Sequence, residues 1–370
     1  MLRVVLAHWS FPPTTGGVES HLSDLAAALS RAGCAVTVLT GEPRPNGAPG
    51  YRVVSTPLLN LAGIRAHDTR DQRPALEAFL RTFLEDVRPD VVHGHNLHHF
   101  WSGPAEVLER LARELGFGLH HTFHETWPDV LHPDPPYRRW TGTYAVSEFV
   151  RQGCGSWLGF CPELLPLGVD VGRFTPAPRG GRPPTVLHPA RLLPWKGGRL
   201  SLEMLRLLRG SGLNARLILT DTQTIVDWDW QLSAYRAEIL AFIEDADLGD
   251  AVELRSVTYE QMPDLYREAD VVIYPTIGDE PYGLVPLEAM SSGRPIVASC
   301  SGGMTETIVD GVTGFIVKRG DVHALTERVG HLLRAPARRR RMGQAARRHV
   351  AEHFGLPGYV DEMLRRYRGA

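Results

Sequence analysis

The chain has 370 residues, of which 43% are hydrophobic and 22% charged, and its formal net charge is −2. A chain of this length exceeds one ordinary core, so we expect two domains. The near-neutral balance argues against a nucleic-acid or anionic-membrane partner, and no apolar run reaches the roughly 18 residues of a membrane-spanning helix. The opening sequence, MLRVVLAHWSFPP, is too short and polar for a secretory signal, which predicts a cytoplasmic location.

Cysteine and lysine are both scarce. Because the cysteines have no CxxC spacing, we expect free thiols at Cys34, Cys154, Cys161 and Cys300. Arginine supplies almost all of the positive charge, and Lys196 and Lys318 are the only lysines. A lysine in such a chain is therefore a candidate for a specific role.

The first half of the chain alternates strands and helices. The apolar run Leu2–Ala7 predicts a buried parallel strand, Glu19–Arg31 an amphipathic helix and Ala35–Leu39 the next strand, which together form a βαβ unit. We predict further strands at Tyr51–Val54, Val91–His93, Gly118–Phe123 and Thr143–Val146, and helices at Ala75–Val87 and Ala105–Leu115. The Pro-, Gly- and Arg-rich stretch Thr175–Thr185 is the predicted linker.

The second half repeats the alternation. Strands are predicted at Val186–His188, Ala215–Leu219, Ala251–Leu254, Val271–Tyr274, Ile296–Ala298 and Gly314–Val317, and helices at Gly198–Arg209, Tyr235–Ala246, Met262–Ala269, Val285–Ser291 and within His323–Arg368. This pattern predicts an α/β fold of two Rossmann-like, doubly wound domains that face each other across a cleft. The predicted domains are residues 1–174 on the acceptor side, residues 175–352 for the donor, and a helix at 353–370 that returns to the N-domain.

The strongest chemical signal is the sequence DEPYGLVPLEAM, which follows a predicted strand. Glu280 stands in the loop and can accept hydrogen bonds from sugar hydroxyls, whereas Glu288 stands in the following helix and can accept from a ribose. Gly283 allows close backbone approach, and the helix start at Leu284 and Val285 offers free N–H groups to a diphosphate.

Two further segments support a phosphate site. The sequence HPARLLPWKGG follows the first strand of the second half and carries Arg191 and Lys196, two cations that can hold a diphosphate and offset its charge as it leaves. Gly16 and Gly17 follow the first strand of the chain, where backbone can approach phosphate or acceptor. A solvated basic loop and an ordinary glycine turn are the alternatives.

Histidines gather after two predicted strands. They are His93, His95, His98 and His99 after one strand, and His120, His121 and His124 around the end of another. A metal site is one interpretation, but no ligand spacing completes it. We favour polar residues of a cleft, with His124 as the active-site candidate.

A basic run follows Ala335 and includes four consecutive arginines. Membrane or nucleic-acid binding is one interpretation. Because Met342, Ala345, Ala346 and Val350 recur at helical spacing, an exposed face of an amphipathic helix is favoured.

These features together resemble the GT4 family of retaining glycosyltransferases, which have the GT-B fold. The resemblance covers nearly the whole chain. Its motifs are Gly16-Gly17-Val18-Glu19, Asp90-Val91-Val92-His93, Thr122-Phe123-His124, Leu167-Gly168-Val169-Asp170, Arg191 with Lys196, Glu280 to Glu288, and Gly302-Gly303 with Glu306 and Asp310-Gly311-Val312-Thr313-Gly314.

The resemblance implies a role for each matching position. It makes His124, Arg191, Lys196 and Glu280 the catalytic group, with His124 near the donor sugar and acceptor. The implied donor-binding residues are Gly16, Gly17, Arg191, Lys196, Glu280, Tyr282, Gly283, Leu284, Val285 and Glu288. No metal and no resident cofactor are expected, and the co-substrate is a nucleotide sugar, with a UDP-sugar favoured.

The chain departs from the family pattern in two places. His188 stands where the family often has glycine, and Thr220-Asp221-Thr222-Gln223 replaces a common Gly-x-Gly turn. About twelve residues, Ile225 to Tyr235 with Trp228 and Trp230, then precede the next helix. Donor contacts at that turn are therefore open.

The expected reaction is transfer with retention, in which the leaving phosphate takes the acceptor proton. A sugar-nucleotide 2-epimerase and a histidine-metal hydrolase are the rival interpretations. Polar residues in N-domain loops, Asp68, Asp71, His98, Glu125 and Asp129, favour a small polar acceptor that carries a hydroxyl. Together with an arginine-rich composition typical of a GC-rich actinobacterial coding sequence, they suggest an aminocyclitol or other natural product as in antibiotic biosynthesis. A lipid-linked or polysaccharide acceptor is the equally open alternative. Stable membrane insertion is not expected, and the oligomeric state is open.

Overall fold

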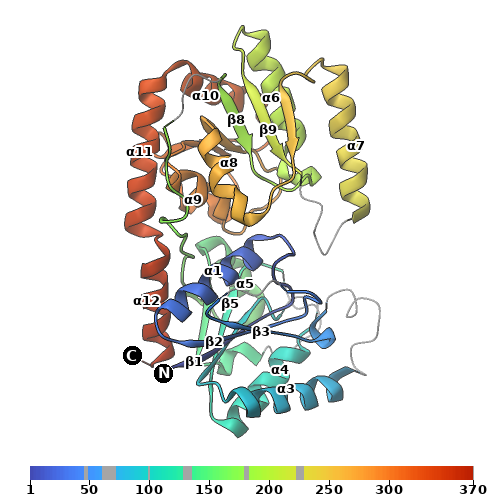
Figure 1. The fold of residues 1–370 in the computed structure, drawn as a ribbon, viewed down its shortest axis with the longest axis vertical. Helices are drawn as coiled ribbons and strands as arrows, with labels where there is room; N and C mark the ends of the chain where they lie inside the picture. The colour runs from blue at the N-terminus through green and yellow to red at the C-terminus, as the bar shows by residue number, and fades with distance from the viewer. Residues whose placement is uncertain are drawn as a thin grey trace. The chain divides into compact units, whose positions relative to one another are not determined.

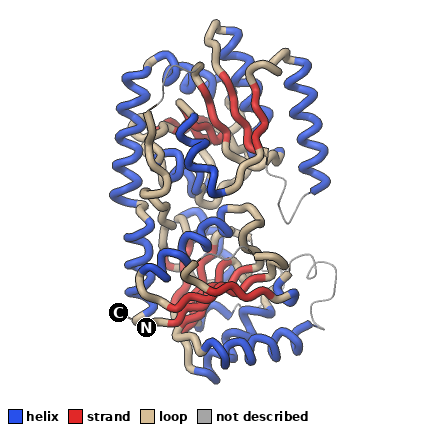
Figure 2. The backbone as a smooth tube through the Cα atoms, viewed as in Figure 1, coloured by secondary structure: helices blue, strands red, loops and turns tan. Residues whose placement is uncertain are grey.

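The computed structural model describes residues 1–45, 49–60, 72–98, 101–127, 136–178, 183–221 and 229–369. The chain divides into two compact units. Unit 1 comprises Met1–Gly168 with Leu356–Ala370, and unit 2 comprises Val169–Gly355. Each unit is built around its own parallel sheet with helices packed against it (Figures 1 and 2).

Unit 1 contains a seven-stranded sheet in the order β3-β2-β1-β4-β5-β6-β7. Its strands are β1 (Arg3–His8), β2 (Ala35–Thr40), β3 (Arg52–Ser55), β4 (Val91–His95), β5 (Gly118–Phe123), β6 (Gly142–Ala145) and β7 (Glu163–Leu164). All strand pairs are parallel, and Val4 of β1 pairs with Val36 on one side and Val91 on the other. The strand order reverses direction between β1 and β4, which makes their carboxyl ends the expected ligand position of this sheet.

The helices of unit 1 cover this sheet. Among the described residues they are α1 (Gly17–Arg31), α3 (Arg73–Val87), α4 (Gly103–Leu115), α5 (Glu148–Leu158) and α12 (Leu356–Tyr367), with short 3-10 turns at Pro57–Leu59 and Pro136–Arg139. The predicted apolar face of α1 is confirmed, because Leu22, Leu25, Ala26 and Leu29 are fully buried. The chain's last helix, α12, lies beside α1 in unit 1.

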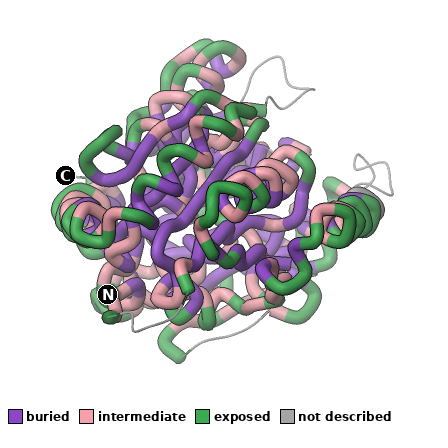
Figure 3. Tube along the Cα trace, turned by 90° about the horizontal axis from the view of Figure 1, so that it is seen from above, coloured by how far each residue is buried: buried purple, intermediate pink, exposed green. Residues whose placement is uncertain are grey.

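Unit 2 contains a six-stranded sheet in the order β10-β9-β8-β11-β12-β13. Its strands are β8 (Thr185–His188), β9 (Arg216–Thr220), β10 (Val252–Arg255), β11 (Val271–Tyr274), β12 (Ile296–Ser299) and β13 (Gly314–Val317), all paired in parallel. Here the order reverses between β8 and β11. The apolar runs from which the strands were predicted form the buried centre of unit 2, and exposed residues lie on the outer helices (Figure 3).

The helices of unit 2 are α6 (Gly198–Gly210), α7 (Asp229–Asp245), α8 (Met262–Glu268), α9 (Leu284–Ser291), α10 (Val322–Arg334) and α11 (Pro336–His353), with 3-10 turns at Pro194–Lys196, Tyr259–Gln261 and Gly302–Glu306. The basic run forms α11. Met342, Ala346 and Val350 are buried on one side of this helix, as its periodicity predicts, and Arg339 pairs with Asp270 at 3.0 Å.

The chain enters unit 2 at Val169, ahead of both the predicted boundary after residue 174 and the predicted linker. Phe174 explains the difference, because its buried ring packs on Tyr266 and its carbonyl accepts hydrogen bonds from Ser291 and Arg347. Elsewhere, α5 and β7 were not predicted, and α7 begins at Asp229 rather than at Tyr235. All four cysteines are free thiols. Asp68, Asp71, His99, Asp129 and the segment 222–228 lie outside the described residues.

Candidate functional site

The carboxyl ends of β8 and β11 in unit 2 lead into two loops that are joined through one backbone carbonyl. The carbonyl of Trp195, in the loop after β8, accepts hydrogen bonds from Thr276 Oγ1 and from the backbone N–H of Ile277, both at 2.8 Å. Gly197, with φ of +81°, lies so close to the Pro275 carbonyl that a Cβ there would overlap it. The two loops are therefore held in fixed register at the reversal point of the sheet.

This register brings Lys196 and Glu280 together. Lys196 Nζ donates to Glu280 Oε2 at 2.7 Å and to the Tyr274 hydroxyl at 3.1 Å. The Tyr274 hydroxyl in turn donates to Glu280 Oε2 at 3.0 Å, which closes a three-membered cluster. The Lys196 and Glu280 side chains are each 13% exposed, so the charges are largely shielded but reachable from solvent.

The surroundings of Lys196 and Tyr274 shift the pKa of both side chains upward. Burial lowers the pKa of Lys196, but the charge of Glu280 and the Tyr274 hydroxyl outweigh it, so the pKa of Lys196 is raised above its ordinary value. Burial and the nearby Glu280 raise the pKa of Tyr274 to about 12. Near neutral pH, Lys196 is thus a fixed cation and Tyr274 a neutral hydrogen-bond donor.

Glu280 is also positioned through its backbone. Its N–H donates to Ser301 Oγ at 3.0 Å, and its carbonyl accepts from the N–H of Gly303 at 3.0 Å. Gly302 has φ of +48° and lies against the Glu280 carbonyl, where a side chain would collide with backbone. Oε1 of Glu280 forms no hydrogen bond with the described residues, which leaves an acceptor for a ligand hydroxyl.

The predicted helix start after Glu280 is present. Gly283 precedes α9 with φ of +86°, and it provides no side-chain cap for the first turn. The N–H groups of Leu284 and Val285 therefore lie at the positive end of the helix dipole. Both residues are partly exposed, whereas Tyr282 is buried.

A glutamate that binds a ribose is expected to have a carboxylate accessible to the ligand, and Glu288 differs from this expectation. It is buried, and its Oε2 accepts a hydrogen bond of 2.7 Å from the hydroxyl of Tyr266. Burial, followed by the charge of Glu288, raises the pKa of Tyr266 well above its ordinary value. Contact between Glu288 and a ribose stays a prediction.

Arg191 follows β8 and is partly exposed. Its side chain forms no hydrogen bond or ion pair with the part of the chain that the structure describes, in contrast to Lys196. The two cations are close enough for Arg191 to lower the pKa of Lys196. A second positive charge thus lies beside the Lys196–Glu280 pair and can receive an anion.

In unit 1, the predicted glycine pair leads into a buried acidic group. Gly17 is the first residue of α1, and the Cα of Gly16 lies against the carboxylate of Glu19. Glu19 accepts a hydrogen bond from Ser10 Oγ, and its Oε1 lies 3.7 Å from His8 Nε2. Burial raises the pKa of Glu19, but the interactions with His8 and Ser10 outweigh it and hold the pKa at about 2.

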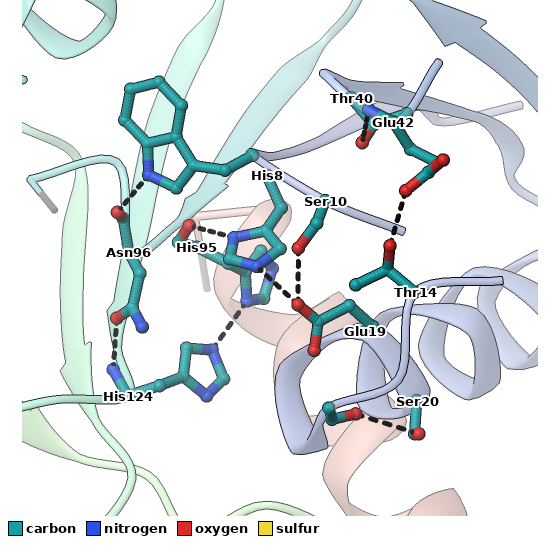
Figure 4. Close-up of polar contacts among 12 residues, drawn as sticks. His8, Ser10, Thr14, Glu19, Ser20, Thr40, Glu42, His95, Asn96 and His124 are labelled. Atoms are coloured by element: carbon teal, nitrogen blue, oxygen red, sulfur yellow. Dashed lines mark hydrogen bonds and ion pairs between the residues drawn. The ribbon is translucent and has the colours of Figure 1, made fainter. Parts of the chain in front are cut away.

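Several of the described histidines of unit 1 form a buried group around the ends of β4 and β5. His124 Nε2 is hydrogen-bonded to His95 Nδ1 at 3.0 Å, and the backbone N–H of His124 donates to Asn96 Oδ1 at 2.7 Å (Figure 4). Burial lowers the pKa of both rings well below the ordinary histidine value. The buried histidines are His8, His21, His93, His95, His98, His120, His121, His124 and His188, the last of which belongs to unit 2.

Sequence reasoning missed several residues of these two clusters. Tyr274 ends the predicted strand β11 and Tyr266 lies in the predicted helix at Met262–Ala269, but neither was named as a site residue. His8 and Asn96 follow the same pattern, because each stands at a strand end. The available signal was their position at the carboxyl ends of strands next to a reversal of strand order.

Two absences among the described residues bear on the predicted partners. No group of three or more His, Cys, Asp or Glu side chains in these ranges could hold a metal ion. No helix among them is both long and apolar enough to cross a membrane.

Comparison with known proteins adds to this geometry. The model of the family described as "Glycosyltransferase Family 4" matches residues 15–173, and the model of the family described as "Glycosyl transferases group 1" matches residues 175–349. The GDP-mannose-dependent alpha-(1-6)-phosphatidylinositol monomannoside mannosyltransferase of Mycolicibacterium smegmatis is 29% identical, over 97% of this chain and 94% of its own length. The D-inositol 3-phosphate glycosyltransferase of Paenarthrobacter aurescens is 28% identical, over 96% of this chain and 93% of its own.

Among solved structures, HepE of Anabaena in complex with UDP and glucose superposes with a TM-score of 0.78 and 18% identity, and the match covers all of both chains. This likeness shows the fold, the two-domain GT-B arrangement of Rossmann-like sheets. Together with the two family matches, it identifies the chain as a member of the GT4 family, a hexosyltransferase that uses a nucleotide sugar as donor.

Proposed function

We propose that the enzyme transfers a hexose from a UDP-sugar, with retention of anomeric configuration, to a hydroxyl group of a small cyclitol-like acceptor. The observation that carries the proposal is the Lys196–Glu280–Tyr274 cluster at the reversal point of the unit 2 sheet. It combines a fixed cation with a carboxylate that keeps one free acceptor oxygen. A diphosphate and a sugar hydroxyl are the groups that fit these two features.

In this mechanism, Lys196 and Arg191 bind the donor diphosphate. The bond between the anomeric carbon and the phosphate oxygen breaks, and negative charge grows on the departing diphosphate. Two cations held in place before the reaction stabilise this charge without reorganisation. Glu280 Oε1 accepts from a hydroxyl of the transferred sugar and thereby fixes the position of its anomeric carbon.

The proton balance needs no dedicated carboxylate base. The acceptor oxygen forms its bond to the anomeric carbon on the face from which the phosphate departs. Its proton passes to the oxygen of the leaving phosphate, so the products are the glycoside and the nucleoside diphosphate. Attack on that face retains the configuration.

We propose that this chemistry requires no metal and no resident cofactor. The support is the charge supplied by Lys196, whose raised pKa keeps it protonated, and by Arg191 beside it. Undiminished transfer in the presence of EDTA is the expected result. Loss of transfer that only a divalent cation restores would count against this part, and stoichiometric zinc or iron with hydrolase activity would favour the rival histidine-metal enzyme.

The acceptor proposal rests on unit 1 and on the relatives. Two carboxylates, Glu19 and Glu42, lie where β1 and β2 leave the sheet, and Ser10 and Thr14 hydroxyls hold them in place. Arg44 beside them is exposed. Two carboxylates against one exposed arginine favour a neutral or cationic polyol, such as an aminocyclitol, over a phosphorylated polyol. Both relatives named above carry inositol, a cyclitol, in their names.

Two alternatives have an observation of their own. The Mycolicibacterium relative is named as GDP-mannose-dependent, which supports GDP-mannose as the competing donor. Its name also contains phosphatidylinositol, which supports a lipid-linked acceptor.

The test measures thermal stability of the purified chain with UDP, GDP and ADP sugars, because a ligand that binds the folded state raises its stability with occupancy. The stabilising donor is then incubated with inositol, inositol phosphate, aminocyclitols and phosphatidylinositol, and the anomeric configuration of the product is determined by NMR. We expect stabilisation by a UDP-sugar and an α-glycoside from an α-linked donor. A β-glycoside, or an epimerised sugar formed without acceptor, would contradict the proposal.

A further inference from the structure

Two neighbouring strand ends in unit 1 are tied together around the ring of His124. Asn96 follows β4 and accepts the His124 backbone N–H, while its own carbonyl accepts from Trp9 Nε1 at 2.7 Å (Figure 4). Asn96 has φ of +49°, a left-handed conformation that is uncommon outside glycine and is concentrated at functional sites. The backbone of His124 is therefore held by a strained residue.

The His124 ring is held by a second contact. Its Nε2 is 3.0 Å from His95 Nδ1, and the carbonyl of His95 is bonded to His8 Nδ1 at 2.8 Å. Since His95 is itself tied to β1 by this bond, it offers a rigid partner. His124 Nδ1, in contrast, forms no hydrogen bond with the described residues.

A hydrogen bond between two neutral imidazoles has one donor and one acceptor. If His95 Nδ1 carries the proton, His124 Nε2 accepts and His124 is protonated at Nδ1. In the opposite arrangement, His95 is protonated at Nε2 and His124 Nε2 is the donor. The two arrangements differ in what they leave at His95 Nε2, which is buried and has no partner among the described residues.

The buried Nε2 atom decides between these arrangements. A buried N–H without an acceptor loses its hydrogen bond to water with nothing in return, and such orphaned donors are rare in folded proteins. A bare lone pair at the same place is tolerated more often. The favoured arrangement therefore puts the His95 proton on Nδ1.

We propose that His95 is a positioning residue that holds His124 as its neutral Nδ1–H tautomer, so that His124 offers a hydrogen-bond donor to an oxygen of the bound substrates. The tautomer follows from the geometry of unit 1, whereas the role in catalysis rests on the proposed function. In this form His124 supplies directional hydrogen bonding and does not act as a general base.

Both rings stay neutral because burial disfavours the charged form. It is the largest cause of the lowered pKa of His124, and neighbouring imidazoles lower it further. The titratable groups that face His124 and its neighbouring rings come from every packed element: His8 from β1, Glu19 and His21 from α1, His93, His95 and His98 from β4 and the loop after it, His121 from β5, and Tyr359 from α12. Glu19 is the one carboxylate of this set, and it pairs with His8.

The tautomer can be observed without substrate. Two-bond ¹H–¹⁵N NMR spectra of the ¹⁵N-histidine-labelled full chain separate the Nδ1–H, Nε2–H and imidazolium forms, and the His124→Gln variant identifies the signal. We expect a neutral Nδ1–H pattern that persists from about pH 8 to about pH 6. An Nε2–H pattern, or an imidazolium at neutral pH, would overturn the proposal.

The positioning role is tested with two side chains of similar size. His95→Asn keeps a donor near the position of Nδ1, whereas His95→Leu removes it. We expect kcat/KM to fall about 10- to 100-fold in the Leu variant and to recover to within a few-fold of wild type in the Asn variant. Equal activity of the two variants, at either level, would overturn the role, provided that thermal unfolding shows both to be folded.

His120→Gln is the matched control. His120 is as deeply buried as His95 and is bonded to Tyr144 at 2.8 Å, but no hydrogen bond joins it to His124. We expect the NMR pattern of His124 to be unchanged in this variant. A changed pattern would mean that the tautomer of His124 responds to any disturbance of the buried core and is not set by His95. If wild-type protein transfers no sugar from any donor while the Nδ1–H pattern is present, the proposed function fails and the tautomer assignment stands.

Discussion

The two units carry the same parallel-sheet architecture, but they fill the reversal point of strand order in opposite ways. In unit 2, a lysine and a carboxylate meet there, each 13% exposed. In unit 1, the corresponding edge holds histidine rings whose pKa values burial lowers. Unit 2 thus presents a lysine cation at this point, whereas the ends of β4 and β5 in unit 1 present neutral histidine rings, with the Glu19 carboxylate beside His8.

This difference matches the two halves of a transfer reaction. A departing diphosphate gains negative charge, and a fixed cation is the most effective partner for it. An incoming hydroxyl is neutral and must be oriented, which directional hydrogen bonds do well. The comparison teaches that one sheet topology can support either task, because the residues at its strand ends decide the electrostatics.

The strongest test of this electrostatic difference between the two units is to remove the lysine cation of unit 2. We expect Lys196→Ala to lower kcat about 10²- to 10³-fold, since in the proposed mechanism it deletes the charge that stabilises the leaving diphosphate, and among the described residues it leaves Glu280 Oε2 with Tyr274 as its partner. Steady-state kinetics with a saturating donor measures the loss. The matched control is Lys318→Ala, because Lys318 is the only other lysine and is exposed. Equal activity of both variants would remove Lys196 from the site.

Glu280→Gln keeps the shape of the side chain and removes its charge. We expect kcat/KM to fall about 10- to 100-fold, because the sugar loses a charged hydrogen-bond acceptor and Lys196 loses its counter-ion. The comparison is sharpened by measuring the same variant with donors that lack one sugar hydroxyl. If Glu280 contacts one sugar hydroxyl, the donor that lacks this hydroxyl will have a similarly low kcat/KM with the wild type and with Glu280→Gln. If the substitution instead lowers kcat/KM by the same factor with every donor, that contact is contradicted.

The register between the two loops of unit 2 is tested by a glycine pair. Gly197 and Gly212 flank α6 and both have φ of +81°, but only Gly197 lies against backbone, at Pro275. We expect Gly197→Ala to destabilise the protein by about 2–4 kcal/mol and Gly212→Ala by about 1 kcal/mol, as backbone strain alone costs. Thermal unfolding and kinetics are the measurements. Equal losses would show that the loop contact does not matter.

The smallest expected effect concerns Glu19, the carboxylate that pairs with His8 in unit 1. The folded-state pKa of Glu19 is lowered from 4.5 to about 2, so its contribution to stability is fully present above pH 4.5 and is lost as the pH falls towards 2. We expect Glu19→Gln to be less stable than wild type by about 1–3 kcal/mol at pH 7, and the difference to shrink between about pH 4.5 and about pH 2. A difference that is constant over this range would contradict the assigned pKa.

The strands were the most predictable part of the molecule. Buried parallel strands are continuous apolar runs, and β5, β11 and β13 have the predicted bounds. The helix α5 was missed because Glu148–Leu158 contains two glycines, and β7 because two exposed residues carry no periodic pattern. Such elements are stabilised by tertiary packing, which a local pattern does not contain.

Within the candidate site, charged residues were easier to find than their neutral partners. Lys196 was conspicuous as one of two lysines, and Glu280 as an acid in a loop after a strand. Tyr274 and Tyr266 reach Glu280 and Glu288 only through the fold, from an apolar strand and a short helix. A pattern that marks a residue as apolar hides the hydroxyl at its tip, so the partners of buried carboxylates were beyond sequence reasoning.

The last helix of unit 1 has a consequence for how the chain is made. Unit 2 is continuous from Val169 to Gly355, whereas unit 1 needs α12, whose Tyr367 bonds to His93 in the middle of the first sheet at 2.6 Å. On a ribosome, we expect unit 2 to complete its core first, because unit 1 must wait for α12 to emerge. During that interval the histidines of the first sheet stay exposed to solvent, so the buried environment that keeps their rings neutral forms only after α12 has joined unit 1.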